Sequence, residues 1–218
     1  MSTTNSQWYS DANNGKDLDP EKVKAARRDE IDGFVKRQVY EARPRAEAVE
    51  ADIKPIGVRW VDVEQNSGVR SRFVCQDFNP EKGRKKHVEE AFAPTPPLLA
   101  SRWLLSQAAS EGDYGRGTKR IMCVDFTKAF LYGRMTRKVY IELPPEDQRR
   151  ALGQVGLLHR AMYGLRDAPA IWQGVVLSLL NEGFKAIVTS KCVYYNKDLD
   201  ITIVAHVDDF LCYGEKAR

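Results

Sequence analysis

Residues 203–213 read IVAHVDDFLCY and place two adjacent acids, Asp208 and Asp209, between two short apolar runs. Runs rich in β-branched and aromatic residues on either side of a polar pair predict a β-hairpin with the acids at its turn. Because successive strand side chains point to opposite faces, the two carboxylates diverge, and chemistry at Asp208 requires a further carboxylate from elsewhere. An isolated acidic pair is also an ordinary polar turn, so both interpretations stand at this point.

Asp125 is the candidate for the further carboxylate. It ends the apolar run RIMCVD, residues 120–125, and the tight segment FTKAF, residues 126–130, follows it. Carboxylates at neighbouring strand ends can hold two divalent cations about 3.5–4 Å apart, which clamp the attacking and leaving oxygens of a phosphoryl displacement. The acids therefore favour phosphoryl transfer as the candidate chemistry.

The composition indicates a globular chain. Its 218 residues, 43% hydrophobic and 29% charged, fit one large domain or two small ones. No apolar run reaches the length of a membrane span, and the MSTTNS start lacks the apolar segment of a signal peptide, so we expect an intracellular protein with no membrane partner. The four scattered cysteines favour buried free thiols over zinc or disulfides, and the formal charge of +4 permits a phosphate-bearing partner without demanding one.

The N-terminal part contains a predicted tail and a predicted helix. Residues 1–18 are rich in Ser, Thr, Asn, Asp and Gly and are expected to be disordered. Residues 19–49 hold a charged helix from Pro20 to about Tyr40, followed by a polar connector over 43–54. Five apolar residues share a stripe of this helix: Val23, Ile31, Phe34, Val35 and Val39.

A second hairpin is predicted from residues 56–63 and 69–75, which flank the turn sequence QNSG. By the period of two, Arg70, Arg72 and Val74 lie on one face of its second strand. Planar guanidinium groups on one face suit phosphate oxygens. A pair of solvated charges on an edge strand is the alternative interpretation.

The remaining pattern alternates between helices and strands. A helix after Thr95 has an apolar face formed by Leu98, Leu99, Trp103, Leu104 and Ala108. A strand is expected at 139–143, a further strand and turn at 156–164, and a hairpin over 192–204 that leads into His206. A helix from Asp167 directs inward Ile171, Trp172, Val175, Leu179 and Leu180. This order predicts an α+β fold, an antiparallel sheet with helices packed on one face.

Four sequence blocks resemble, in order and spacing, those of the reverse transcriptase of copia-type LTR retrotransposons. They are VDFTKAFLYG (124–133), VYIELP (139–144), AMYGLRDAPAIW (161–172) and HVDD (206–209). FAP (92–94), RSRFV (70–74) and the helix AARRDEI (25–31) also match, so the resemblance runs from about Glu21 to Gly214. It implies a right-hand polymerase with fingers at 50–96 and 133–166 and a truncated palm at 97–132 and 167–218.

The resemblance also implies roles for individual residues. Asp125 and Asp208 match the acids that bind two Mg²⁺ ions, for which Mn²⁺ substitutes, and Asp209 is a third carboxylate nearby. One ion activates the primer 3′-hydroxyl, and the other carries the triphosphate. Residues matching the nucleotide pocket are Arg70, Arg72, Phe126, Phe130, Tyr163 and Gly164, of which Phe130 excludes a 2′-hydroxyl. Those matching positions near the primer are His206 and Val207.

Four positions depart from the resembled pattern. The family usually has tyrosine where this chain has His206, commonly lysine at Gln76, and often Lys-Gln at Arg166-Asp167. His206 is shorter than tyrosine but can still contact a primer backbone. Asp167 places an additional acid near the expected nucleotide pocket.

The function implied is an RNA-directed DNA polymerase that adds deoxynucleotides to a primer 3′-hydroxyl on an RNA or DNA template. The alternative is a decayed or repurposed fragment that folds and binds nucleic acid without turnover. The chain ends at Arg218, before the family's primer grip, thumb and RNase H regions, so we expect little processive synthesis from these residues alone. The resemblance implies a cytoplasmic virus-like particle or the nucleus as location and leaves the oligomeric state open.

Overall fold

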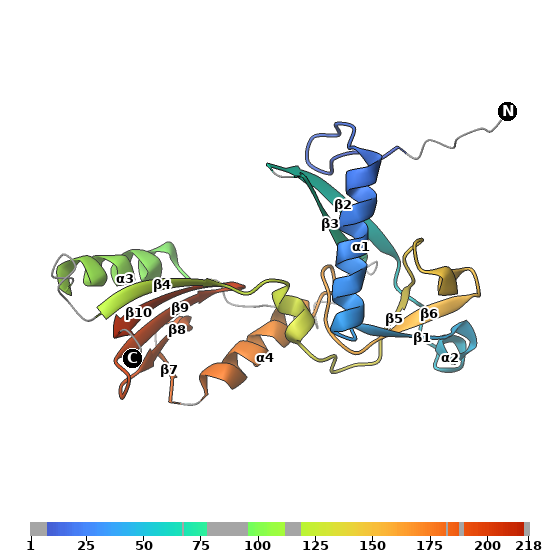
Figure 1. Ribbon diagram of the computed structural model, residues 1–218. Helices are drawn as coiled ribbons and strands as arrows, with labels where there is room; N and C mark the ends of the chain where they lie inside the picture. The colour runs from blue at the N-terminus through green and yellow to red at the C-terminus, as the bar shows by residue number, and fades with distance from the viewer. Residues whose placement is uncertain are drawn as a thin grey trace, which may run out of the picture. The chain divides into compact units, whose positions relative to one another are not determined.

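The computed structural model describes residues 8–66, 68–77, 96–111, 119–181, 183–187 and 190–215. The chain divides into two compact units (Figure 1). Unit 1 comprises Met1–Arg84 and Arg134–Ala168, and unit 2 comprises Lys85–Gly133 and Pro169–Arg218. The expected FAP block at 92–94 lies outside the described residues.

Unit 1 contains two antiparallel sheets. The first has the order β1 (Tyr40–Pro44), β6 (Gln154–Leu158) and β5 (Tyr140–Glu142). The second is the predicted hairpin, β2 (Val58–Gln65) with β3 (Gly68–Cys75), which the structure confirms. Short helical segments are α2 (Arg45–Glu50) and η3 (Gln148–Arg150). Since α2 buries Ala48, the expected polar connector over 43–54 is wrong.

Helix α1 (Pro20–Lys36) begins as its sequence predicts. Asp19 caps it by accepting hydrogen bonds from the Glu21 and Lys22 amides, and proline occupies the first helical turn. Its buried face packs on β3, where the Phe34 and Phe73 ring centroids are 5.9 Å apart.

The expected extension of this helix to Tyr40 is wrong. Gln38 has a φ of +51°, and Tyr40 pairs with Leu158 instead of continuing the helix. The end of the helix is decided by a strand far along the chain, which no local pattern reveals. Val35, expected on the apolar stripe, is exposed.

Residues 8–18 fold onto unit 1, so the expected disorder is wrong for this part of the tail. Ser10 and Asp17 form an antiparallel bridge, and Tyr9 and Leu18 are buried. The buried Asp11 carboxylate accepts hydrogen bonds from the amides of Glu64, Asn13 and Asn14, which outweigh the effect of burial and lower its pKa. The polar composition of residues 8–18 gave no indication of these contacts, because the distant partner, Glu64, lies on β2.

Unit 2 is built on a five-stranded antiparallel sheet. Its strands, in spatial order, are β4 (Lys119–Asp125), β10 (Asp209–Glu215), β9 (Ile201–His206), β8 (Ser190–Asn196) and β7 (Lys185–Ile187). Its helices are α3 (Leu98–Glu111), α4 (Ala168–Leu180) and the short η2 (Ala129–Tyr132). The α+β class expected from the sequence is therefore confirmed.

The helices of unit 2 cover opposite faces of the sheet (Figure 1). On one face α4 contributes Trp172 and Val176 to a cluster with Tyr194, Ile203, Ala205 and Phe210. On the other, α3 contributes Leu104 and Ala108 to a cluster with Val193, Val204 and Tyr213. The expected packing of helices on one face is wrong, because strands that are apolar on both faces need cover on each.

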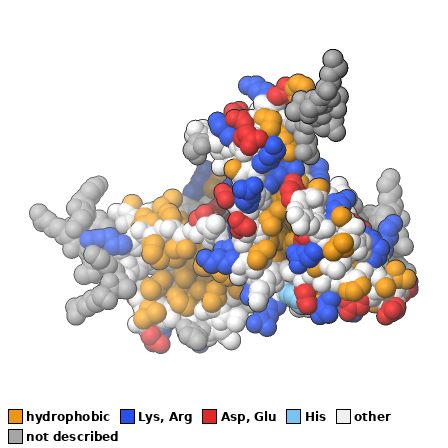
Figure 2. All heavy atoms as spheres, turned by 45° about the vertical axis from the view of Figure 1, so that its right-hand side comes forward, with side chains coloured by type: hydrophobic (Ala, Val, Ile, Leu, Met, Phe, Trp, Pro, Cys, Tyr) orange, Lys and Arg blue, Asp and Glu red, His pale blue; other side chains and the backbone are white. Residues whose placement is uncertain are grey.

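Both helices also present apolar side chains to the surface, and Figure 2 shows hydrophobic groups among the exposed side chains. Leu98, Leu99 and Trp103 of α3 and Leu179 of α4, all expected in the core, are exposed. Of the cysteines, Cys75 and Cys192 are buried free thiols, as predicted, whereas Cys123 is exposed. Among the described residues, no helix combines the length and apolarity needed to span a membrane.

Candidate functional site

The acid-bearing hairpin predicted from the sequence is confirmed. Strands β9 and β10 pair His206 with Asp209, which leaves Val207 and Asp208 as the turn. Val207 has a φ of +55°, a conformation that β-branched residues rarely adopt and that costs about 1–3 kcal/mol. Such strain persists only where the surroundings impose it, so the turn is held rather than free.

Asp125 lies beside this hairpin. Strand β4 pairs with β10 so that Asp125 and Asp209 are directly opposite, and the Phe126 amide donates a 2.9 Å hydrogen bond to the Asp208 carbonyl. Directly opposed side chains share a face, with Cβ atoms about 4.5–5.5 Å apart. The structure therefore brings all three predicted acids to one end of the sheet, and the residue opposite Asp125 is Asp209 rather than Asp208.

Aromatic packing supports the turn from the α4 side. The Phe126 ring lies 5.4 Å from Trp172 and 5.0 Å from Phe210, centroid to centroid. The Trp172 indole N–H donates a hydrogen bond to the Val207 carbonyl. Phe126, predicted in the nucleotide pocket, is thus partly buried against this cluster.

Phe130 and His206 lie near the acids in the chain but in different settings. Phe130 belongs to η2, which follows Lys128 in the left-handed conformation with a φ of +59°, and its half-buried ring packs against the same cluster. His206 is exposed at the end of β9 and lies directly opposite Asp209. His206, Phe130 and the three acids therefore all lie at this end of the sheet.

The three acids carry carboxylate oxygens, the type of ligand that hard cations such as Mg²⁺ prefer. Asp125 and Asp209 are exposed, Asp208 is half-buried, and no described residue forms an ion pair with any of the three. The described residues also contain no group of three or more His, Cys, Asp or Glu side chains arranged to hold a metal ion. Mg²⁺ is commonly bound by one or two carboxylates, with waters and substrate phosphates completing its shell, so a protein cage is not required.

In unit 1, the side chains of β3 point alternately to the two faces of the hairpin. Ser71, Phe73 and Cys75 are buried, while Arg70 and Arg72 lie on the opposite face, as predicted. Burial, with a smaller contribution from Asp77, raises the pKa of the Cys75 thiol to about 12.

A third arginine joins this face. Arg59 of β2 pairs with Val74, and the register places it on the face that carries Arg70 and Arg72. In the sequence, strand alternation already places Arg59 on the opposite face from Trp60 and Asp62. Only the hairpin register shows that this face is the one that carries Arg70 and Arg72. We call these three residues the arginine face. None of them forms an ion pair with a described residue.

Arg72 is the most enclosed member of the arginine face. Its guanidinium lies 5.6 Å from the centroid of the Tyr163 ring, and its Nε is buried without a hydrogen-bond partner among the described residues. The Cys75 amide donates a 2.8 Å hydrogen bond to the Tyr163 carbonyl. The structure thus brings together Arg72 and Tyr163, which the sequence assigned to one pocket.

Gly164 follows with a φ of +83°, and a Cβ added there would lie 2.0 Å from the Cys75 carbonyl oxygen. Gly164→Ala is therefore expected to destabilise unit 1 by about 3 kcal/mol or more, from backbone strain and the close approach of β3. Gly153→Ala is the matched control, since Gly153 has a φ of +70° with nothing within 4 Å of an added Cβ. It should cost only about 1–2 kcal/mol. Equal losses in thermal unfolding would contradict the steric argument.

The two departures at Arg166 and Asp167 lie in an ion-pair network. Arg137 Nε binds Asp167 at 2.7 Å, Arg137 Nη2 binds Asp77 at 3.1 Å, and Arg166 Nε binds Asp77 at 3.2 Å. The hydrogen bond to Asp167 is the largest cause of the raised pKa of Arg137. Asp167 is therefore neutralised by an arginine and ties the Tyr163–Gly164 turn to the end of β3.

A model of the family described as reverse transcriptase (RNA-dependent DNA polymerase) matches residues 47–218. The chain is 25% identical over 173 residues to the retrovirus-related Pol polyprotein from transposon TNT 1-94 of Nicotiana tabacum, covering 74% of this chain and 12% of that protein. It is 28% and 29% identical over 170 residues to the corresponding polyproteins from transposons RE1 and RE2 of Arabidopsis thaliana, covering 73% of this chain and 11% of each.

The chain thus spans about 12% of the length of these curated relatives. Among solved structures, a foamy viral protease-reverse transcriptase dRH in complex with double-stranded DNA aligns over 90% of this chain and 26% of that chain. The TM-score of that alignment is 0.43, with 13% sequence identity.

Proposed function

Because the chain belongs to the reverse transcriptase (RNA-dependent DNA polymerase) family, we propose that unit 2 carries the acids of a polymerase active site. The reaction would add deoxynucleotides to a primer 3′-hydroxyl on an RNA or DNA template. The observation that carries this proposal is the register that sets Asp125 opposite Asp209, with Asp208 in the adjoining turn. Three acids without an ion-pair partner among the described residues, at the end of one sheet, suit a reaction that handles phosphates and divalent cations.

We assign unit 1 to the fingers and unit 2 to the palm. The chain passes between the units at Arg84–Lys85, Gly133–Arg134 and Ala168–Pro169. The last two lie close to the boundaries of 133 and 166 expected from the sequence blocks, whereas the first lies 12 residues before the expected boundary at 96. The arginine face belongs to unit 1 and the acids to unit 2. Under this assignment, unit 1 would bind the triphosphate and unit 2 would bind the metal ions.

We propose one role for each of the predicted site residues. Asp125, Asp208 and Asp209 would hold Mg²⁺, which when bound lowers the pKa of a coordinated hydroxyl and neutralises phosphate charge. Arg70 and Arg72 would bind the triphosphate through charge-assisted hydrogen bonds. The nucleotide-binding residues proposed in unit 2 are Phe126 and Phe130, and those proposed in unit 1 are Tyr163 and Gly164. The residues proposed beside the primer are His206 and Val207.

A divalent cation is expected to stabilise unit 2. Like charges directly opposite in a sheet repel, as Asp125 and Asp209 do here, and a bound cation relieves that repulsion. At a Mg²⁺ concentration ten times its Kd, binding to the folded state adds about 1.4 kcal/mol of stability. Thermal unfolding with and without Mg²⁺ measures it. Asp209→Asn should be more stable than the unaltered chain without Mg²⁺ and should respond less to the ion.

Asp198→Asn is the control for that measurement, because Asp198 is an exposed acid in the turn between β8 and β9. It should keep the full response to Mg²⁺. No Mg²⁺ effect on the unaltered chain would reject the metal site and favour a fragment that binds nucleic acid without turnover.

Phe130→Ala is expected to relax sugar selection in a reverse transcriptase that carries this sequence. Removing the ring opens space for a ribose 2′-hydroxyl, and the ratio of ribonucleotide to deoxyribonucleotide incorporation should rise about tenfold or more. Primer extension with each nucleotide class measures that ratio. Tyr132→Ala removes another ring from η2 and should leave it unchanged, whereas an unchanged ratio for Phe130→Ala would leave Phe130 a core residue.

A further inference from the structure

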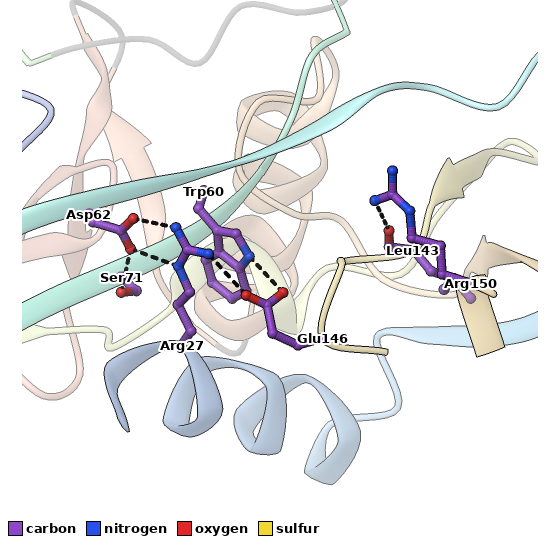
Figure 3. Close-up of polar contacts among 7 residues, drawn as sticks. All are labelled: Arg27, Trp60, Asp62, Ser71, Leu143, Glu146 and Arg150. Atoms are coloured by element: carbon purple, nitrogen blue, oxygen red, sulfur yellow. Dashed lines mark hydrogen bonds and ion pairs between the residues drawn. The ribbon is translucent and has the colours of Figure 1, made fainter. Parts of the chain in front are cut away.

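The buried face of the β2–β3 hairpin carries a polar cluster centred on Arg27 of α1 (Figure 3). Arg27 Nη2 donates to Asp62 Oδ2 at 2.7 Å, and Nε donates to Asp62 Oδ1 at 3.3 Å. Arg27 Nη1 donates to Glu146 Oε1 at 2.9 Å. One guanidinium therefore joins α1 to β2 and to the loop that follows β5.

Arg27 and Asp62 are the enclosed members of this cluster, whereas the Glu146 side chain is 34% exposed. The Arg27 side chain is 11% exposed and the Asp62 side chain 7%. The guanidinium lies 4.8 Å from the Tyr9 ring centroid and 5.0 Å from the Trp60 centroid, and the Trp60 indole N–H donates to Glu146 at 2.9 Å. Burial alone lowers the pKa of Arg27, but the bonds to Asp62 and Glu146 outweigh it and the pKa is raised. Losing Arg27 would leave the buried Asp62 carboxylate without its cationic partner.

Asp62 extends the cluster to the strand that carries two members of the arginine face. Asp62 pairs with Ser71 across the hairpin, and the Ser71 hydroxyl donates a 2.6 Å hydrogen bond to Asp62 Oδ1. Ser71 lies between Arg70 and Arg72 in the chain. Because strand side chains alternate, the contact that fixes Ser71 on the buried face also fixes the direction of its two neighbours on the opposite face.

We propose that Arg27 is a positioning residue for the triphosphate-binding strand, acting through Asp62 and Ser71 on the orientation of Arg70 and Arg72. The inference rests on the proposed function, since it takes the arginine face as the triphosphate site. Arg27 precedes the family match at 47–218, whereas its partners Asp62 and Glu146 lie inside it. A segment outside the family match thus holds a strand within it.

The geometry requires arginine in particular. Its planar fork presents donors in fixed directions, which here engage both oxygens of Asp62 and one of Glu146. A lysine ammonium is a single charged centre and cannot match the two carboxylates in this arrangement while stacking between the two rings. Arg27→Lys preserves the charge and therefore tests the geometry of the fork.

The test measures binding of inorganic tripolyphosphate to the full chain, without divalent cations, so that the acids of unit 2 play no part. Arg27→Lys and Arg27→Met are expected to weaken binding about tenfold, within the range that coupled residues show. Val155→Ala is the matched control, because Val155 is fully buried in unit 1 and does not contact the cluster. It should lower thermal stability and leave the affinity unchanged at a temperature where all variants are folded.

A double-mutant cycle separates positioning from general stability. Arg27 and Arg72 lie on opposite faces of the hairpin, and they should nevertheless be non-additive. With Arg72→Ala already present, Arg27→Lys should weaken binding by much less than tenfold. Additive effects in the cycle would overturn the inference.

The two failures are distinguishable. If Arg72→Ala leaves tripolyphosphate binding unchanged, the proposed triphosphate site is wrong and the inference falls with it. If Arg72→Ala weakens binding but the Arg27 variants do not, only the positioning role is rejected. Should the Arg27 variants fail to fold, Ser71→Ala removes a single hydroxyl and is expected to weaken binding about threefold, whereas unchanged binding would reject the role.

Discussion

Asp208→Asn is expected to lower primer extension by about 10³-fold in a reverse transcriptase that carries this sequence, as removal of a preorganised electrostatic group does in other enzymes. Asparagine keeps the shape of the side chain but removes the charge that would hold a divalent cation in the turn between β9 and β10. The measurement is extension of a primed RNA template with Mg²⁺ and deoxynucleotides. Circular dichroism should show an unchanged fold, because Asp208 is only half-buried.

Two further variants test whether the loss of primer extension is specific to Asp208. Asp198→Asn neutralises an exposed acid in another turn of the same sheet and should retain activity. Asp209→Asn compares the two adjacent acids, since the sequence blocks favour Asp208 as the partner of Asp125 while the register places Asp209 opposite it. A larger loss for Asp209→Asn would exchange their roles, and full activity of both variants would reject the catalytic assignment.

Trp172→Ala is expected to destabilise unit 2 by about 3–5 kcal/mol, the cost of deleting a large buried ring. Trp172 is 1% exposed, packs against Phe126, and donates its indole N–H to the Val207 carbonyl in the acid-bearing turn. Amide hydrogen exchange in β9 and β10 measures the loss without depending on the tryptophan signal.

Trp172→Phe separates the contribution of the hydrogen bond from that of ring packing, and Leu179→Ala is the control on the same helix. Phenylalanine retains most of the ring contact but leaves the Val207 carbonyl without its donor, so about 1–3 kcal/mol should be lost. Leu179 lies on the same helix but is 60% exposed, and Leu179→Ala should change stability by no more than about 0.5 kcal/mol. A Trp172→Ala loss equal to that of Leu179→Ala would contradict the packing described.

Features specified by neighbouring residues were predictable from the sequence. The hairpin around Asp208 follows from two apolar runs and a polar pair, and the separation of Arg70 and Arg72 from Ser71 follows from strand alternation. The start of α1 follows from Asp19 and Pro20. In each case the deciding contacts lie within a few residues.

Features decided by distant partners were not predictable. The end of α1 depends on the pairing of Tyr40 with Leu158, and the folding of residues 8–18 depends on contacts with β2. The register that sets Asp125 opposite Asp209, and the face on which Arg59 lies, required strand pairing that periodicity does not specify. Arg27 looked like one charge among many on a solvated helix face, because its burial depends on Asp62 and Glu146.

The pairing of β1 with β6 also sets the order in which the chain can fold during synthesis. Pro44 leaves the ribosome about 110 residues before its partner Gln154, a delay of about 5–20 s at ordinary elongation rates. In that interval β1 has no partner strand, while β2 and β3 can close as a local hairpin within microseconds. Completion of unit 1 therefore waits until the first half of unit 2 has been translated, which makes the nascent chain vulnerable to proteolysis and mispairing at β1.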